Sequence, residues 1–204
     1  MAAEIGFGAL FITLIVAVYG IAAAIYGVKN KEQAWVLSAR QAMRLIFPLL
    51  TISVGSMLYL LATSHFEVVY VADVSSRSMP LYLKLTALWG GQAGSLLFWT
   101  WLLAAFSSAA TLRNWNRDQD LLPWVIVVNL VTLAFFLVLN IFFENPFIRY
   151  WQDASGILTA FNQPPGAVPI FPRDGGGLNP LLRHPGMIIH PPMQYLGFVG
   201  FIIP

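Results

Sequence analysis

Residues 5–28 read IGFGALFITLIVAVYGIAAAIYGV, an apolar stretch without a charged side chain. A helix that crosses a bilayer needs about 20 consecutive, mostly apolar residues. Lipid offers the backbone no hydrogen-bond partners, so a spanning segment is either a helix or part of a closed β-barrel. The alternation of apolar and polar residues that marks barrel strands is absent here. This stretch therefore predicts a membrane-spanning helix.

Composition extends this prediction to the whole chain. The 204 residues are 58% hydrophobic and 10% charged, whereas soluble domains carry about 25% charged residues. So few charges cannot cover the surface of a water-soluble protein of this length, but a surface that faces lipid needs none. The chain contains no cysteine, which excludes disulfides, thiolate metal sites and cysteine nucleophiles.

Further apolar stretches predict further spans. We expect an all-α, polytopic membrane helix bundle, with four full spans and the start of a fifth in one membrane domain (residues 1–204). The external connections should include one long irregular loop. The expected spans are 5–28, 42–62, 87–112, 122–143 and 187–204, and the expected external loops are 64–86 and 144–186.

The fifth apolar stretch is short. Its apolar run from Gly197 ends at Pro204 before it could cross a bilayer. We therefore expect a fragment, or one product of a split gene, whose helix continues in a longer protein. The alternative is a helix that lies at the membrane interface.

Basic residues predict the orientation of the spans. They are denser on the side that follows the first and third spans, which the positive-inside rule assigns to the cytoplasm. The N-terminus and both external loops then face the periplasm or its equivalent. Glu4 and the lack of a basic N-terminal region argue against a cleaved signal peptide. The cytoplasmic set is Lys29, Lys31, Arg40, Arg44, Arg113 and Arg117, and the expected interface anchors are Trp35, Trp89, Trp115, Trp124, Tyr150 and Trp151.

Two loop segments have their own patterns. Residues 66–71 alternate and contain β-branched side chains, which predicts a short extended piece on the outer surface. Residues 156–185 are rich in proline and glycine and cannot form one helix, so we expect a mostly irregular external loop.

The chain has three histidines, His65, His184 and His190. His190 precedes Pro191 and Pro192, and a proline restricts the residue before it to extended geometry. A helix should then begin at Pro192, where its missing N–H is not needed. One interpretation is an imidazole held above a helix end, where it ligates a metal or haem iron or relays a proton. The other is an interfacial histidine bonded to a backbone carbonyl.

Residues 89–95, WGGQAGS, open the third predicted span. Glycines there permit close helix packing or an irregular backbone. The segment could place a flat ligand against Trp89, Trp99 and Trp101, or it could serve only helix packing and an aromatic belt. Asn129 and Asn140, within the fourth span, should face other helices.

No charged residue lies near the centre of a full span, which disfavours an ion-coupled transporter. The scattered basic residues form no nucleic-acid patch, and nucleotide-binding and HExxH motifs are absent. A scaffold that docks partner subunits through residues 144–186 stays open as an alternative to an enzyme component.

Several motifs together resemble the CcmF-type cytochrome c haem lyase subunits (the CcmF/CycK/NrfE family). They are WGGQAGSLLFW at 89–99, NPF at 145–147, GLNPLL at 177–182, and HPPM, YLG and FVGF between 190 and 201. The resemblance runs along essentially the whole chain and covers what corresponds to the N-terminal portion of that family.

The resemblance implies a function in cytochrome c maturation in the cell inner membrane or the mitochondrial inner membrane. Haem b is the substrate; it is delivered by the membrane haem chaperone CcmE and attached to the CxxCH thiols of apocytochrome c, with a CcmH-type thiol-handling subunit as a partner. His190 would be the first of two external axial ligands of the haem iron. The residues implied to support this site are Trp89, Gly90, Gly94, Trp99, Pro191, Pro192 and Tyr195.

The chain also departs from the family pattern. The tryptophan-rich WWD segment, the second flanking histidine and the histidine pair for a structural haem b are expected beyond Pro204. Many members carry His or Glu where Gln92 and Ala93 stand here, which argues against a charge-based role at those positions. We therefore expect this chain alone to be an incomplete lyase. The motifs do not distinguish it from the nitrite reductase paralogue.

Overall fold

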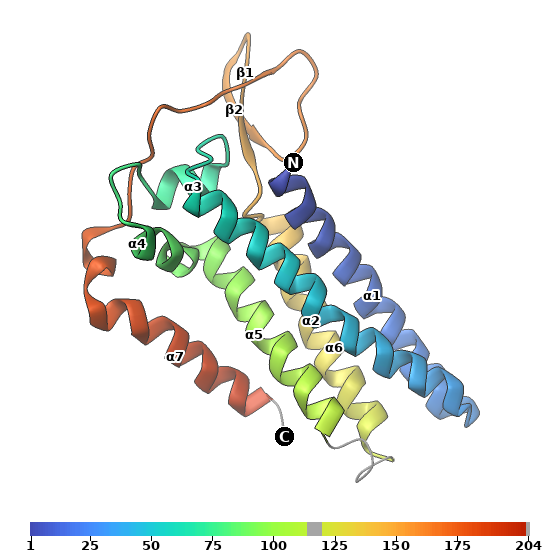
Figure 1. Ribbon diagram of the computed structural model, residues 1–204. Coiled ribbons are helices and arrows are strands. Elements are labelled where there is room, and N and C mark those ends of the chain that lie inside the picture. The colour runs from blue at the N-terminus through green and yellow to red at the C-terminus, as the bar shows by residue number, and fades with distance from the viewer. Residues whose placement is uncertain (114–119, 203–204) are drawn as a thin grey trace.

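Four long helices form the body of the computed structural model, which describes residues 1–113 and 120–202. Figure 1 shows them running side by side. In the described part of the chain, four helices are long and apolar enough to cross a membrane. The chain is therefore a multi-pass membrane protein built as a helix bundle, as the sequence predicted. The four helices are α1 (Ala2–Asn30), α2 (Gln33–Ala62), α5 (Gln92–Arg113) and α6 (Leu122–Val138), whose candidate span continues to Phe143.

Shorter elements gather at the end of the bundle that holds the N-terminus, which we call the capped end (Figure 1). A further helix, α7 (Pro185–Ile202), begins near this end and packs against α5. The cap consists of α3 (Val69–Val74), α4 (Leu81–Thr86), the 3-10 turn η1 (Ala87–Trp89), strands β1 (Arg149–Asp153), β2 (Gly156–Ala160) and β3 (Val168–Pro169), and the 3-10 turn η3 (Pro180–Arg183).

Helix α1 packs on its neighbours through a seam of mostly small residues. A Cβ atom at Gly20 would lie 2.6 Å from Cδ1 of Leu130 and 3.1 Å from Cβ of Ala42, so the backbones meet where no side chain fits. Small residues at such positions let membrane helices approach closely, and a seven-residue repeat keeps the seam on one side. The seam consists of Ala3, Leu10, Ala17 and Ala24, and of Gly6, Thr13, Gly20 and Gly27.

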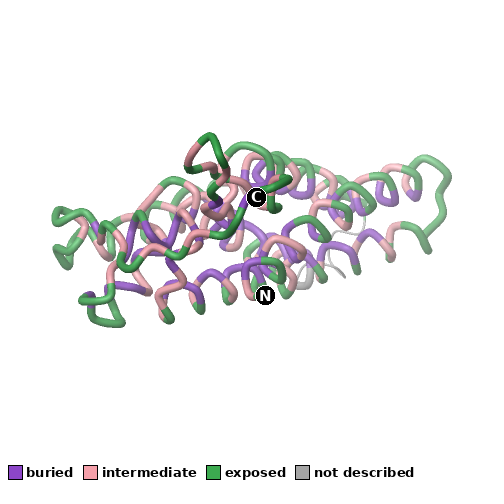
Figure 2. The backbone as a smooth tube through the Cα atoms, turned by 90° about the horizontal axis from the view of Figure 1, so that it is seen from above, coloured by how far each residue is buried: buried purple, intermediate pink, exposed green. Residues whose placement is uncertain are grey.

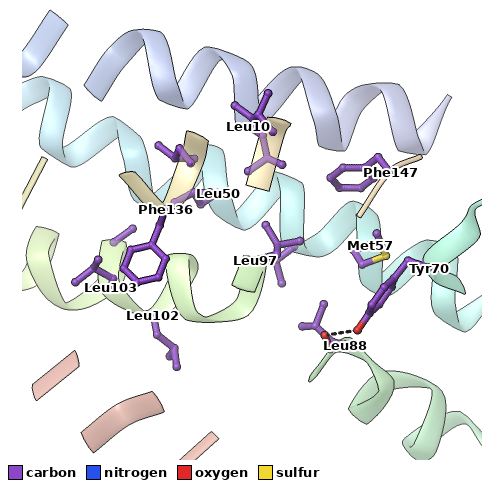
Figure 3. Packing of buried hydrophobic residues seen from close by; sticks show 14 of the residues in the cluster. Leu10, Leu50, Met57, Tyr70, Leu88, Leu97, Leu102, Leu103, Phe136 and Phe147 are labelled. Atoms are coloured by element: carbon purple, nitrogen blue, oxygen red, sulfur yellow. Dashed lines mark hydrogen bonds between the residues drawn. The ribbon is translucent and has the colours of Figure 1, made fainter. Parts of the chain in front are cut away.

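The core lies between the four helices. The buried stretches of the tube face one another in Figure 2, and Leu10, Leu50, Leu97 and Phe136 fill the interior in Figure 3. Some polar side chains in the core form hydrogen bonds across helices, where unpaired polar groups would be costly. Two such bonds join α5 to the segment that follows it. Ser107 Oγ donates to Asn129 Oδ1 on α6 at 3.0 Å, and Asn140 Nδ2, just past the end of α6, donates to Thr100 Oγ1 at 2.9 Å.

The connection between α1 and α2 is tighter than the sequence suggested. Lys31 adopts the left-handed conformation and its N–H contacts the carbonyls at the end of α1, so α2 can begin at Gln33. Arg40 and Arg44 therefore lie on α2 and not in a loop. Trp115, expected as an interface anchor, and Arg117, expected as a cytoplasmic charge, lie outside the described residues.

The extended piece expected at residues 66–71 is wrong. Val68 forms a single β-bridge with Arg149, and α3 begins at Val69. Strand propensity depends on context, and here Tyr70, Val71 and Val74 bury one side of a short helix. Tertiary packing therefore overrides the local preference.

The segment after α6 is less irregular than expected. Strands β1, β2 and β3 form a small antiparallel sheet in the order β2-β1-β3. The turn after β1 is closed by Asp153, whose carboxylate accepts hydrogen bonds from the backbone N–H groups of Ser155 and Gly156. An Asp-to-backbone turn of this kind favours a hairpin, so the helical bundle carries one small sheet on its cap.

Candidate functional site

A cavity of about 630 Å³ lies between η1, the start of α5, the end of α6 and α7. Its volume is in the range of about 300–1,000 Å³ typical of ligand pockets. Most lining side chains are apolar, and Gln92, Ser95 and Glu144 add polar groups to the wall. The lining consists of Trp89, Gly90, Gly91, Gln92, Ser95, Leu96, Trp99, Leu139, Phe143, Glu144, Leu182 and Tyr195.

One wall of the cavity comes from a π-helical turn that follows α6, η2 (Leu139–Phe143). Within it, Asn140 is fully buried and its Nδ2 also donates to the carbonyl of Phe136 at 2.9 Å. This bond ties the side chain to the preceding turn of α6, and the bond to Thr100 holds the π-turn against α5. Single π-turns of this kind occur frequently at functional sites.

Aromatic rings connect α5 to α7 at this cavity. The rings of Trp99 and Tyr195 stack with centroids 5.6 Å apart and planes 15° apart, and Phe98 meets Tyr195 edge-on at 6.2 Å. Such pairs stabilise a contact beyond the area they bury. The buried indole N–H of Trp99 has no hydrogen-bond partner among the described residues.

The turn that carries Trp89 is fixed by Tyr70, a residue that the sequence analysis did not single out. Its hydroxyl donates to the carbonyl of Ala87 at 2.8 Å and accepts from the N–H of Gly91 at 3.2 Å; its bond to Leu88 is drawn in Figure 3. Burial raises the pKa of Tyr70, so the phenol stays neutral. Its helical pairing with Val74 is the sequence signal that could have indicated its burial.

Gly94 contributes by lacking a side chain. A Cβ atom there would collide with the hydroxyl of Tyr70 and the carbonyl oxygen of Leu88. Gly94 therefore allows α5 to begin directly beneath the turn that Tyr70 holds.

The chain reaches α7 through residues 173–178, which we call the strap. The N–H of Gly176 donates to Ala72 O at 2.7 Å. The Asp174 carboxylate accepts from the N–H of Arg77 at 2.8 Å, and this N–H, followed by that of Gly175, lowers the pKa of Asp174. The strap is thus tied to α3 and to the loop that follows it.

Helix α7 is capped by His184. Its Nδ1 accepts from the N–H of Gly186 at 3.1 Å, and its carbonyl accepts from Met187 at 2.8 Å. An Nδ1 acceptor requires the neutral imidazole with the proton on Nε2. His184 therefore serves the start of the helix, while His65 is elsewhere on the cap with Nδ1 2.7 Å from a carboxylate oxygen of Glu67.

The extended geometry expected at His190 is wrong. Helix α7 begins at Pro185 and continues through His190, Pro191 and Pro192. Prolines inside a helix remove hydrogen bonds, but the indole Nε1 of Trp89 donates to the carbonyl of Ile188 at 3.1 Å. A tertiary hydrogen bond is therefore present at the point where the local sequence disfavours the helix.

The structure brings some of the predicted site residues together and separates others. Trp89, Gly90, Trp99 and Tyr195 line the cavity. His190 does not line it; its side chain is exposed, on α7 with Ile189 and Met193, which are 62% and 60% exposed. Pro191 and Pro192 are half-buried. No cluster of three or more His, Cys, Asp or Glu residues that could hold a metal ion occurs in the described ranges.

A sequence model of the cytochrome C assembly protein family matches residues 89–204, more than half of the chain. The chain belongs to this family. Its relatives show that it is of the CcmF type: it is 33% identical over 203 residues to the cytochrome c-type biogenesis protein CcmF of Haemophilus influenzae, covering 100% of this chain and 29% of that relative. It is 35% identical over 157 residues to the probable cytochrome c-type biogenesis protein NrfE of Escherichia coli, covering 77% of this chain and 25% of that relative.

The fold of this CcmF-type chain is also that of a solved structure. Cytochrome c Heme Lyase CcmF superimposes with a TM-score of 0.77 at 21% identity, over 100% of this chain and 29% of that one. The chain spans 29% of the length of its Haemophilus influenzae relative. The family match begins at Trp89, so it includes the cavity wall from η1 and α5, the strap and α7.

Proposed function

We propose that this CcmF-type chain is a component of the cytochrome c haem lyase. In this function it receives haem b as substrate from a membrane haem chaperone of the CcmE type, and the haem is attached to the CxxCH thiols of apocytochrome c. The observation that carries the proposal is that α7 combines two features. One side of the helix is held at an aromatic cavity through Tyr195, and the helix presents an exposed imidazole, His190.

His190 has the chemistry that the proposal requires. A neutral imidazole is a common axial ligand of haem iron, and an exposed imidazole does not have to break buried hydrogen bonds before it binds. Ile189 and Met193 are exposed beside it, and such apolar side chains suit the apolar edge of a porphyrin. His190 therefore acts as an axial ligand of the substrate's iron.

The cavity residues act in this proposal through α7 and not by contact with the iron. A ligand must be held in a defined place to be effective, and this needs supporting residues whose own positions are locked. Trp99 and Tyr195 supply a stacked contact. Gly94 lets α5 approach η1 closely, and Gly90 leaves room for the side chain of Leu178. Pro191 and Pro192 fix φ at two successive positions next to the imidazole.

The orientation belongs to the same proposal. Lys29 and Lys31 lie at the end of the bundle opposite the cap, and the positive-inside rule assigns that end to the cytoplasm. The capped end then faces the periplasmic side of the inner membrane. Apocytochrome c and a CcmH-type thiol-handling subunit approach from that side.

A second candidate function is a scaffold that docks other maturation subunits. It is favoured by exposed apolar side chains on the cap: Ile157 is 67% exposed, Val168 58% and Phe171 68%. Ile157 and Val168 flank Gln152 in the sheet, and exposed apolar surface of this kind can mark an interaction site. In this case His190 would have no function of its own.

The test uses the complete protein that contains this segment. His190→Ala should abolish the haem Soret absorption of the purified protein and lower the yield of mature cytochrome c about tenfold or more, because losses of this size accompany even the removal of a ligand's supporting partner. Gln194→Ala, exposed on the same helix, is the matched control and should change neither. An unchanged spectrum and a normal yield in His190→Ala would contradict the ligand role. Loss of subunit co-purification in Phe171→Ser would then favour the scaffold.

A further inference from the structure

The carbonyl of Ile188 has an unusual place in α7. In an α-helix a carbonyl accepts from the N–H four residues later, and in a tighter 3-10 turn from the N–H three residues later. For Ile188 these two positions are occupied by Pro192 and Pro191. Proline has no backbone N–H, so α7 cannot supply either of the usual partners for this carbonyl.

The missing donor comes from a distant part of the chain. The Nε1 atom of Trp89, 99 residues earlier in the sequence, lies 3.1 Å from the carbonyl oxygen of Ile188. The indole N–H can only donate. Both residues are half-buried, where leaving a donor or an acceptor unpaired is unfavourable. The bond therefore pairs the indole N–H with a carbonyl whose two usual helical donors are absent.

The position of Trp89 is itself determined by contacts that do not involve α7. Its ring packs on Phe98 with centroids 5.2 Å apart, and Tyr70 holds the carbonyl of Ala87 and the N–H of Gly91 on either side of it. The indole is thus held in place independently of α7 and donates its N–H to the turn of α7 that carries His190. His190 is two residues after Ile188.

We infer that Trp89 is a positioning residue for His190, and that its indole N–H replaces the backbone donors that Pro191 and Pro192 remove. The consequence for haem rests on the function proposed above, whereas the consequence for α7 does not. This inference has a testable consequence: the indole N–H of Trp89 is needed as a donor to the Ile188 carbonyl only while the prolines are present. Pro192→Ala restores an N–H four residues after Ile188 and makes the indole donor redundant.

The experiment is a double-mutant cycle in the complete protein with Trp89→Phe, Pro192→Ala and the double variant. Phenylalanine keeps an aromatic ring and loses the N–H. Two properties are measured: hydrogen exchange of the first turns of α7 without haem, and haem absorption with cytochrome c yield. Trp89→Phe alone should accelerate exchange and lower haem binding about fivefold to tenfold, the effect of one hydrogen bond. In the Pro192→Ala background the same change should cost less than about twofold, because the restored backbone N–H would then donate to Ile188.

Trp101 supplies the control. Its Nε1 donates to Oγ1 of Thr51 at 2.9 Å, from the same helix that packs against α7. Trp101→Phe loses an equivalent bond, and Pro192→Ala should not relieve its effect. Equal costs of Trp89→Phe in both backgrounds would mean that the ring acts by packing alone, which would overturn the inference.

The two readouts distinguish this inference from the proposed function. If the cycle shows coupling in hydrogen exchange while His190→Ala leaves haem binding intact, Trp89 positions α7 as inferred and the haem role of His190 fails. If His190→Ala abolishes haem binding while Trp89→Phe changes neither readout, the haem role stands and the positioning role of Trp89 is overturned.

Discussion

Helices α1 and α7 are both apolar, but they depend on the rest of the molecule to different degrees. Helix α1 contains no proline, and its small-residue seam repeats every seven residues. Its backbone can form all of its helical hydrogen bonds, and its packing surface can be recognised from its own sequence. Helix α7 contains Pro191 and Pro192 in its interior. It uses His184 to cap its first turn and Trp89 to satisfy one of its carbonyls.

The difference shows how a helix can be coupled to a distant segment. A backbone polar group that is buried away from water needs a partner, and a helix without proline finds those partners within itself. A helix that contains proline lacks some backbone N–H donors, and its conformation then depends on the side chain that replaces them. In this chain α7 is such a helix and carries the candidate ligand His190, whereas α1 needs no outside donor and belongs to the body of the bundle.

The largest expected effect tests the seam of α1. Gly20→Leu would force a side chain against Leu130 and Ala42. Overpacking a well-packed core costs up to about 3 kcal/mol, and we expect a loss of this size because the helix backbones cannot separate without breaking the seam. Thermal unfolding of the purified protein in detergent measures it.

Gly8, on the same helix, has no heavy atom within 4 Å of the place where a Cβ would stand. Gly8→Leu should therefore leave the unfolding midpoint nearly unchanged. Leucine is a better helix former than glycine, so equal losses at Gly8 and Gly20 would show that the contact of α1 with Leu130 and Ala42 does not decide the result.

A smaller effect is expected at the cap of α7. His184→Ala removes the acceptor for the N–H of Gly186 and should destabilise the start of the helix by about 1 kcal/mol, as other lost N-caps do. Hydrogen exchange at Gly186 reports it. His184→Asn supplies another good capping acceptor and should recover most of the loss. Without that recovery, His184 would act through something other than its cap.

The smallest effect concerns the strap that leads into α7. The N–H groups of Arg77 and Gly175 lower the pKa of Asp174 from its ordinary value of 3.8. The contribution of this carboxylate to stability is therefore present above pH 3.8 and is lost as the pH falls through the lower folded-state pKa. The amide shifts of Arg77 and Gly175 should titrate together with a midpoint below 3.8 and should lose this step in Asp174→Asn. A midpoint at or above 3.8 would contradict the bonded geometry.

Several features of the bundle could be predicted from the sequence because they depend on local composition. Long apolar stretches predict spanning helices whatever they pack against, and the buried polar residues Asn129 and Asn140 were expected to face other helices, as their bonds to Ser107 and Thr100 confirm. The motifs beginning at Trp89 also indicated the family. The haem ligand role of His190 stays a prediction.

Other features could not be predicted because two parts of the chain decide them jointly. Residues 66–71 have a strand-like pattern, yet Tyr70 finds its partners at Ala87 and Gly91 and the segment becomes helical. The hairpin of β1 and β2 lies in a stretch that looked irregular in the sequence. Its turn is local, but the third strand of the sheet, β3, comes from further along the chain.

The sequence by itself determined that this is a multi-pass membrane protein of the CcmF type, since hydrophobic length and motif spacing are properties of consecutive residues. Only the tertiary structure decided that His190 lies within a helix. The local rule for a residue before proline favours extended geometry, and the opposing contribution is a hydrogen bond from Trp89. A donor 99 residues away has no signature in the local pattern, and it becomes visible only when the chain has folded.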